Sequence, residues 1–388
     1  MIFSKNCTLL TLFILLIAVT GCGDSERSVN PFLHTEEPFF ESWQLFETER
    51  FPNVLVATDG TVIATFGGVS PPEEGRLKVR RSTDGGETWE EPQILLDPIQ
   101  WHGGGSIVDE TNDDILIFAE ARPFTDTHPA GQLVVFRSRD HGQSWEQEDV
   151  TIHPDSKGNI PSMHINERGI TLQHGEYAGR LIRATRVFAD GNEPEHWPDH
   201  YTNAIYSDDG GRTWFPSEPF PANGTGEAAL EELSDGTIYY NSRRHLSTDG
   251  LNPRMRHIAW SYDGGETWED LSVSDVLPDG SQHRDYGLMA GLVRLPVEGK
   301  DILIYSNIDS DEGRVRGTVW ASFDGGQSWP VSRLVDEGNF AYSSLAAGRT
   351  GTASEGMIYL LYEGQSGANI ARFNLVWVLN GQDIEDYL

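Results

Sequence analysis

Short runs in which hydrophobic and polar side chains alternate recur along the chain, and the same turn follows each of them. Alternation of this kind is typical of a β-strand that places one face in a core. In five places the run leads into the pattern Ser-x-Asp-x-Gly-x-Thr/Ser-Trp, at residues 82–89, 138–145, 207–214, 261–268 and 322–329. The first serines of successive copies are 54 to 69 residues apart. A period of this size predicts a repeat architecture built from one supersecondary unit.

The repeated turn has a structural explanation. Its Asp can accept backbone N–H groups across the turn, its Gly permits a positive φ, and its Trp can pack into the body of the protein. One carboxylate per turn, without a closing Glu, is a poor ligand set for calcium. We therefore expect the five turns to hold the strand units together rather than to bind metal.

The length predicts the number of units. Residues 41–388 amount to nearly six units of about 60 residues, and no convincing amphipathic helix lies between the turns. Strand-rich units of this length favour four-stranded blades arranged radially. The expected fold class is all-β, a six-bladed β-propeller in which one blade lacks a copy of the turn. We expect residues 51–66 to begin the first blade and a C-terminal strand over residues 371–379 to close the last.

The first residues have the pattern of an export signal. Lys5 precedes an apolar run over residues 9–19, and Val19-Thr20-Gly21-Cys22 follows as a small-residue cleavage site that ends in Cys. This is a secretory signal of the lipoprotein type. An uncleaved membrane anchor is the alternative, but the run is shorter than the roughly 20 residues that cross a bilayer.

This pattern predicts the organisation of the whole chain. Residues 1–21 are a signal peptide, and Cys22 is the site of lipid attachment. Residues 22–40 form a polar tether, and residues 41–388 form the catalytic propeller. The protein is then an exported lipoprotein held at the cell envelope, at the outer membrane or the periplasmic face, and we expect a monomer.

Charge and cysteine content narrow the chemistry. Sixty acidic and 28 basic side chains give a formal net charge of -32, which argues against general binding of nucleic acid through a basic face. Both cysteines, Cys7 and Cys22, lie in the first 22 residues, so a disulfide framework and a Cys-based metal site are excluded from the folded body. His196 and His200 flank Asp199, but Pro198 indicates an irregular loop, and we expect no metal and no cofactor.

Motifs between the turns resemble those of bacterial exo-α-sialidases (neuraminidases), six-bladed propellers in which the repeated turn is called an Asp box. The resemblance covers most of the chain from about residue 45 to residue 380. Arg50-Phe51-Pro52 is similar to the family's Arg-Ile-Pro motif. The other matches, in chain order, are Glu227 with Arg243, Ser306-Asn307 with Arg314, Ala341-Tyr342-Ser343-Ser344-Leu345, and Leu361-Tyr362-Glu363.

The resemblance implies a role for each of these residues. Arg50, Arg243 and Arg314 bind the substrate carboxylate, Tyr342 is the nucleophile with Glu227 as its base, and Glu363 supports Arg50. The family also uses an Asp as acid/base, but this chain has no Asp between Asp59 and Asp84. Glu73 and Glu74 are the only carboxylates of the corresponding loop, residues 67–75. We assign the acid/base to Glu74, with Glu73 as the runner-up.

Elementary chemistry agrees with these residue types. A 2-keto sugar acid carries a carboxylate on its anomeric carbon, so an anionic nucleophile would be repelled, whereas a neutral phenol is not. A phenol with a pKa near 10 needs an adjacent base, which Glu227 would provide through a short hydrogen bond. Three guanidinium groups can hold one carboxylate through charge-assisted hydrogen bonds.

We therefore expect a retaining exo-α-sialidase that removes terminal α-linked sialic acid from glycoconjugates through a tyrosyl intermediate, with sialylated or related acidic glycans as partners. Two alternatives stay open. The same scaffold could act on another 2-keto-3-deoxy sugar acid of the Kdn or Kdo type, or it could be a catalytically silent carbohydrate-binding propeller. The presence of both Tyr342 and Glu227 counts against the silent propeller, because binding alone requires no base beside a phenol.

Overall fold

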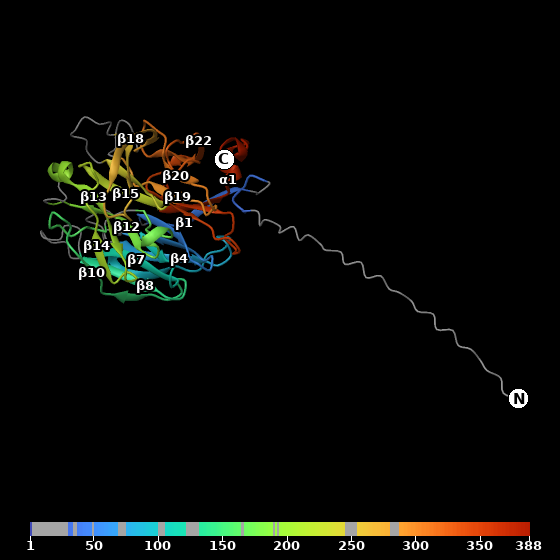
Figure 1. The fold of residues 1–388 in the computed structure, drawn as a ribbon, viewed down its shortest axis with the longest axis horizontal. Coiled ribbons are helices and arrows are strands. Elements are labelled where there is room, and N and C mark those ends of the chain that lie inside the picture. The colour runs from blue at the N-terminus through green and yellow to red at the C-terminus, as the bar shows by residue number, and fades with distance from the viewer. Residues whose placement is uncertain are drawn as a thin grey trace.

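The structure, a computed structural model, describes residues 1, 30–33, 37–48, 50–68, 75–99, 105–121, 132–163, 167–188, 191, 194–244, 254–279 and 287–388. These residues form six sheets around a common centre (Figure 1). The predicted all-β, six-bladed propeller is confirmed. Blades one to five each have four antiparallel strands that are consecutive along the chain, and the third gains a fifth strand that runs parallel to its neighbour. The sixth blade has three consecutive strands and one from the N-terminal end of the chain.

In blades one to five the four antiparallel strands follow one another in chain order outward from the axis. Blade one contains β2 (Pro52–Val56), β3 (Val62–Phe66), β4 (Gly75–Ser82) and β5 (Gln93–Ile99). Blade two contains β6 (Ser106–Asp109), β7 (Asp114–Ala121), β8 (Gln132–Ser138) and β9 (Glu146–Glu148). Blade three contains β11 (Ile170–Thr171), β12 (Leu181–Val187), β13 (Tyr201–Ser207), β14 (Thr213–Pro216) and the additional β10 (Thr151–Ile152). Blade four contains β15 (Thr225–Glu232), β16 (Ile238–Arg244), β17 (Met255–Ser261) and β18 (Glu269–Pro278). Blade five contains β19 (Gly291–Arg294), β20 (Leu303–Ile308), β21 (Val315–Ser322) and β22 (Val331–Asn339).

The sixth blade joins the two ends of the propeller. It combines β23 (Ser343–Ala347), β24 (Ile358–Glu363) and β25 (Ala368–Phe373) with β1 (Phe40–Phe46), which pairs antiparallel with β25. The predicted closing strand over residues 371–379 was wrong, because β25 ends at Phe373 and the short helix α1 (Leu375–Leu379) follows. The Asn374 side chain caps this helix by accepting a hydrogen bond from the Trp377 amide at 2.9 Å. The outer edge is therefore closed by an N-terminal strand, which leaves fewer unpaired backbone groups on β25.

Part of the predicted tether packs against the propeller. Phe32 is 1% exposed and lies in the core shared by blades five and six. The Asn30 side chain donates a hydrogen bond to the Pro296 carbonyl at 3.0 Å. Burying the Phe32 ring stabilises the fold by about 2 kcal/mol, so residues 30–33 belong to the folded unit. The predicted end of the polar tether at residue 40 is corrected accordingly.

The remaining N-terminal predictions lie outside the described residues, including Cys22 and the cleavage site before it. Among the residues that the structure describes, no helix has the length and hydrophobicity needed to span a bilayer.

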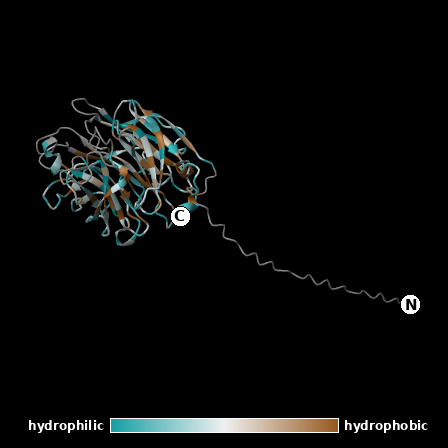
Figure 2. Ribbon diagram, turned by 90° about the horizontal axis from the view of Figure 1, so that it is seen from above, coloured by the Kyte–Doolittle hydropathy of each residue, from teal (hydrophilic) through white to brown (hydrophobic). Residues whose placement is uncertain are grey.

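Apolar layers between neighbouring blades form the core. Six buried clusters are found in the described chain, and each combines side chains from two adjacent blades. The inner strand β2 is buried at every position because sheets cover both of its faces. Hydrophobic segments accordingly follow the strands, whereas hydrophilic ones gather in the outer turns (Figure 2).

The Asp boxes connect the third and fourth strands of blades one to five. In the first box, Ser82 Oγ donates to Asp84 Oδ1 at 2.8 Å and accepts a hydrogen bond from the Gly86 amide at 2.8 Å. The Thr88 amide donates to Asp84 Oδ1 at 2.9 Å. Burial alone would raise the pKa of Asp84, but the hydrogen bonds from Thr88 and Ser82 lower it to about 2. The corresponding Ser-to-Asp bond recurs at Ser138, Ser207, Ser261 and Ser322.

Each of the first four boxes also receives an Arg from the preceding blade. These guanidinium groups donate to a box carbonyl at 2.8 to 3.1 Å, in the pairs Arg372–Gly85, Arg81–His141, Arg137–Gly210 and Arg180–Gly264. The boxes therefore join adjacent blades, as the sequence predicts.

Candidate active site

The predicted site residues gather where the inner strands begin. Arg50 lies two residues before β2, Glu227 is the third residue of β15, and Tyr342 directly precedes β23. Because β2, β15 and β23 are the inner strands of blades one, four and six, their first residues meet at one end of the propeller axis.

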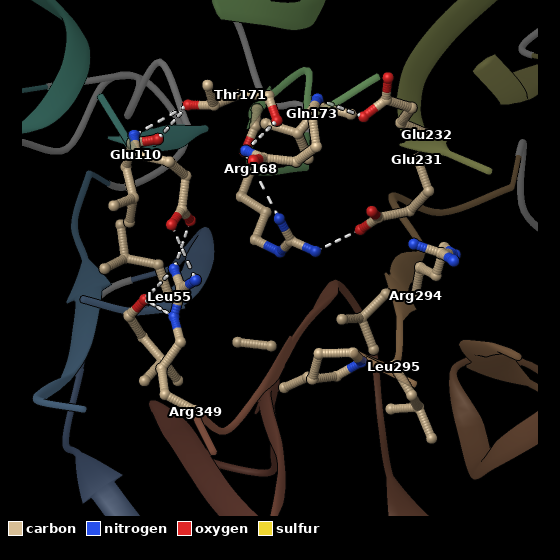
Figure 3. Close-up of a pocket in the computed structure, with 18 of the residues that line it drawn as sticks. Leu55, Glu110, Arg168, Thr171, Gln173, Glu231, Glu232, Arg294, Leu295 and Arg349 are labelled. Atoms are coloured by element: carbon tan, nitrogen blue, oxygen red, sulfur yellow. Dashed lines mark hydrogen bonds and ion pairs between the residues drawn. The ribbon is translucent and has the colours of Figure 1, made fainter. Parts of the chain in front are cut away.

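A cavity of about 300 Å³ with both charged and apolar lining residues lies at the opposite ends of the same strands (Figure 3). It is lined by residues of all six blades, among them Val56, Glu231 and Ala347. Its charged groups pair with one another: Arg349 Nη1 donates to Glu110 at 3.0 Å, and Arg168 Nη2 contacts Glu231. Among the residues that the structure describes, none of those predicted for catalysis lines this cavity.

Arg50 is held by Glu363 through two parallel contacts. Its Nε donates to Oε1 at 3.2 Å, and its Nη2 donates to Oε2 at 3.1 Å. The Phe51 amide donates to the same Oε1 at 3.0 Å. Phe51 has a φ of 71°, an unusual conformation for a residue with a side chain, so the carboxylate fixes a strained turn as well as the guanidinium.

Three cationic groups surround the Tyr342 side chain, which is only 6% exposed. The Cζ atoms of Arg50 and Arg314 each lie 5.3 Å from the centre of its ring. Arg243 Nη1 lies 3.3 Å from the phenol oxygen, to which it donates. The three arginines predicted for the substrate carboxylate therefore converge on one buried phenol.

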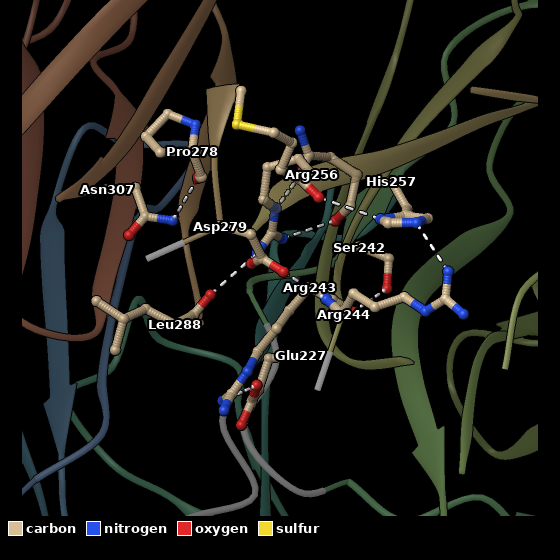
Figure 4. Close-up of polar contacts among 12 residues, drawn as sticks. Glu227, Ser242, Arg243, Arg244, Arg256, His257, Pro278, Asp279, Leu288 and Asn307 are labelled. Carbon is tan, nitrogen blue, oxygen red and sulfur yellow. Dashed lines mark hydrogen bonds and ion pairs between the residues drawn. The ribbon is translucent and has the colours of Figure 1, made fainter. Parts of the chain in front are cut away.

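Glu227 lies beside the same arginine. It is 2% exposed, and its Oε2 accepts a hydrogen bond from Arg243 Nη1, the nitrogen that also contacts Tyr342 (Figure 4 shows Glu227 and Arg243). Burial is the largest single effect and lowers the pKa of Arg243, but Glu227, Tyr342 and Asp279 together raise the pKa by more, and the net shift is upward. The sequence predicts a direct hydrogen bond between Glu227 and Tyr342; the connection seen here runs through Arg243.

Backbone hydrogen bonds fix Tyr342 between the other site residues. The Ala341 amide donates to the Glu363 carbonyl at 3.0 Å, and the Glu363 amide donates to the Tyr342 carbonyl at 2.9 Å. On the other side, the Phe340 amide donates to the Arg314 carbonyl at 2.9 Å. The chain segments of Glu363 and Arg314 thus hold the tyrosine in register.

A buried ion pair behind Arg243 was missed by the sequence analysis. Arg256 and Asp279 are both fully buried, and Arg256 Nη1 donates to Asp279 Oδ1 at 2.9 Å (Figure 4). Asp279 Oδ2 accepts a hydrogen bond from the Arg244 amide at 2.6 Å, next to Arg243. Burial raises the pKa of Asp279 to about 6, while Arg256 opposes the shift. The only signal in the sequence is the charged residue Arg256 in β17, a strand that also contains several apolar residues.

The acid/base candidates Glu73 and Glu74 lie outside the described residues. The described ends of that segment lie beside Arg50: the Arg50 amide donates to the Gly68 carbonyl at 3.0 Å, and the Gly67 amide donates to the Arg50 carbonyl at 2.9 Å. Gly75 lies against Gly68, so both ends of the segment meet near the first arginine.

The possible metal ligand His200 has a structural role. Its Nδ1 lies 2.8 Å from Arg186 Nη2 and its Nε2 lies 2.7 Å from the Gly191 carbonyl. Burial lowers the pKa of His200 to about 4, with a further contribution from Arg186. Within the described ranges, no group of three or more His, Cys, Asp or Glu side chains is arranged to hold a metal ion.

Comparison with known proteins supports the resemblance seen in the motifs. Residues 60–359 match the family described as a BNR repeat-like domain. The chain is 33% identical, over 363 residues, to a sialidase of Micromonospora viridifaciens, in an alignment that covers 86% of this chain and 52% of the relative. The chain belongs to the bacterial sialidase family. The aligned part of this sialidase-family chain spans about half the length of the Micromonospora viridifaciens sialidase.

Solved structures of similar fold include known sialidases and a trans-sialidase. A Hadza microbial sialidase has a TM-score of 0.67 at 26% identity, covering 85% of this sialidase-family chain and 66% of that chain. The intramolecular trans-sialidase from Ruminococcus gnavus, solved with oseltamivir carboxylate, has a TM-score of 0.64 at 18% identity, covering 85% of this chain and 95% of that chain. The second likeness shows the shared fold.

Proposed function

We propose that the protein is a retaining exo-α-sialidase in which Tyr342 is the nucleophile. The observation that supports this most directly is the convergence of Arg50, Arg243 and Arg314 on one buried phenol. In a chain with a net charge of -32, such a cluster is a local site for an anion. A sugar whose carboxylate sits on the anomeric carbon would bring that carbon next to the phenol.

The reaction would proceed in two displacements. Tyr342 oxygen attacks the anomeric carbon while its proton passes to Glu227, and the bond to the departing glycan oxygen breaks as that oxygen takes a proton from Glu74. Water then attacks the same carbon, gives its proton to Glu74, and releases the tyrosine, which recovers its proton from Glu227. Two inversions give overall retention.

Arg243 has a second part in this scheme. Its Nη1 contacts both Glu227 and the phenol oxygen, so it can stabilise the negative charge that develops on that oxygen as the proton leaves. Arg50 and Arg314 bind the substrate carboxylate together with Arg243, and Arg50 is oriented by Glu363.

Release of free sugar from aryl α-glycosides of sialic acid, Kdn and Kdo would test both the activity and the substrate. We expect turnover of the sialoside, with the α-anomer as the first product by NMR. An anhydro sugar as product would instead indicate intramolecular transfer, and a preference for Kdn or Kdo glycosides would support the alternative substrates.

Tyr342→Phe tests whether Tyr342 is the nucleophile. It should abolish turnover of sialosides yet still bind a sialic acid analogue, because it loses only the phenol oxygen. A fluorinated sialic acid donor should label the wild type at Tyr342, and mass spectrometry finding the label elsewhere would exclude the tyrosyl mechanism.

We propose further that Cys22 carries a lipid and holds the enzyme at the cell envelope, where it would meet sialylated glycans. The export signal in the sequence supports this. Cys22→Ser should move the protein from the membrane fraction to the soluble fraction, and a variant that stays with the membrane would contradict the lipid anchor.

A further inference from the structure

Glu167 is a buried acid at the propeller axis that the scheme above does not use. It is 1% exposed and lies three residues before β11. Its Oε1 accepts hydrogen bonds from Ser344 Oγ at 2.8 Å and from the Leu345 amide at 3.1 Å, both on β23. Its own amide donates to the carbonyl of Ala228 on β15 at 3.0 Å.

One more hydrogen bond extends this connection to the first blade. The Val54 amide on β2 donates to Ser344 Oγ at 3.0 Å, the same oxygen that donates to Glu167. Glu167 is thereby joined to the inner strands of blades one, four and six. Its contacts on these strands lie close in sequence to the site: Ala228 follows Glu227, Ser344 is two residues after Tyr342, and Val54 is four residues after Arg50.

The positions of the blades explain why such a connection matters. Tyr342 precedes β23 in blade six and Glu227 lies on β15 in blade four, and these strands belong to different sheets separated by blade five. No sheet ladder can set the distance between the two residues. A residue that bonds to β15 through its backbone amide and to β23 through its side chain can do so.

The environment of Glu167 differs from that of other buried acids near the axis. Glu231 contacts Arg168, and Glu232 accepts hydrogen bonds from the Gln173 and His174 amides. Glu167 Oε2, by contrast, is buried with no hydrogen-bond partner among the described residues. Burial raises its pKa to about 8, opposed by Ser344 and Arg168, so the group is neutral at pH 7. A buried polar atom without a partner costs about 1–3 kcal/mol, and an apolar side chain would avoid that cost.

We propose that Glu167 is a positioning residue for the sialidase reaction, which fixes Tyr342 relative to Glu227 by tying β23 to β15. This inference rests on the proposed function. A shift of about 1 Å between reacting groups can lower a rate by about 10²-fold, so a contact of this kind has a large effect on turnover without touching the substrate.

Two substitutions at Glu167 separate positioning from packing. Glu167→Leu keeps the volume and removes the acceptor, and it should lower kcat on an aryl sialoside by about 10²-fold with KM close to wild type. Glu167→Gln keeps an acceptor oxygen for Ser344 and Leu345, and it should restore kcat to near the wild-type value. Ser344→Ala breaks the same connection with a smaller change in the core, so it serves if Glu167→Leu does not fold.

Glu231→Gln is the matched control. Glu231 is a buried acid on the same strand β15, but it lies at the end away from Glu227 and contacts Arg168. Its substitution should leave kcat unchanged in the folded protein. If kcat in folded Glu167→Leu and Ser344→Ala equals that of wild type, or falls equally in Glu231→Gln, the positioning role is overturned.

A structural readout separates this inference from the proposed function. A wild type that turns over no sialoside would overturn the function. Crystal structures of wild type and Ser344→Ala would then decide the role of Glu167: we expect the separation between the Tyr342 oxygen and the Glu227 carboxylate to change by about 1 Å, and an unchanged separation would overturn it.

Discussion

Arg50 and Glu363, 313 residues apart in the sequence, form a two-point ion pair that links the start of the first blade to the end of a strand in the sixth, with donor–acceptor distances of 3.2 and 3.1 Å. The Arg50 side chain is 33% exposed and the Glu363 side chain 7%, so the guanidinium is partly exposed while its partner is buried. This is the arrangement expected of a cation that is oriented by the protein and available to a ligand.

Loss of this pair should weaken substrate binding. Glu363→Gln removes one charge from the contact, and a hydrogen bond to a charged group contributes about 1.5–3 kcal/mol. We therefore expect KM for an aryl sialoside to rise by about tenfold or more, with a smaller change in kcat. Glu90→Gln, which weakens the rim pair between Arg81 and Glu90, is the control. Equal KM values in wild type and Glu363→Gln would contradict the role of Glu363.

The acid/base assignment predicts an effect that depends on the leaving group. Glu74→Gln should slow cleavage of natural sialosides by about 10²–10⁴-fold, because their alkoxide must be protonated as it departs. Aryl sialosides, whose phenolate departs without a proton, should be spared, and the alkaline limb of the pH profile should flatten. Glu73→Gln is the control. Equal losses on both substrate types would assign Glu74 a binding or structural role.

The buried pair of Arg256 and Asp279 predicts a large loss of stability. Asp279→Ala leaves the Arg256 guanidinium buried without its carboxylate, which should lower the free energy of unfolding by about 3–5 kcal/mol. The double variant Arg256→Met/Asp279→Leu removes both charges and should recover much of that loss. Urea denaturation of the three proteins measures these differences. A double variant as unstable as the single one would show that the contacts to Asn241 and Leu288 matter more than the charge balance.

Glu167 predicts a pH dependence of stability. Its pKa rises from 4.5 to about 8 on folding because the carboxyl is buried, so the folded state holds a proton that the unfolded state releases. The contribution is fully present below pH 4.5 and is lost as the pH rises through 8. Relative to Glu167→Gln, the wild type should lose about 1.4 kcal/mol of unfolding free energy per pH unit in this window. Urea midpoints at pH 5, 6.5 and 8 test this, and a difference that does not change with pH would contradict it.

The sequence by itself determined the repeat, the number of blades and the candidates for catalysis. The Asp boxes could be recognised because each is a local turn: Ser82, Asp84 and Thr88 bond to one another within seven residues. The site motifs could be recognised because the residues of each lie within one part of the chain and resemble family motifs in the same order. Local hydrogen bonding and strand periodicity depend on residues that are close together in the sequence, so a sequence pattern can predict them.

Only the tertiary structure decided how the ends of the propeller close and what lies beneath the site. The pairing of β1 with β25, the burial of Phe32, the pair of Arg256 with Asp279 and the contacts of Glu167 have no local pattern. Glu167 and Ser344 are 177 residues apart, and they meet only because blades three and six present their inner residues to one axis. Such contacts depend on the closed ring of blades, since a buried polar group acquires its partners only when strands distant in sequence are packed together.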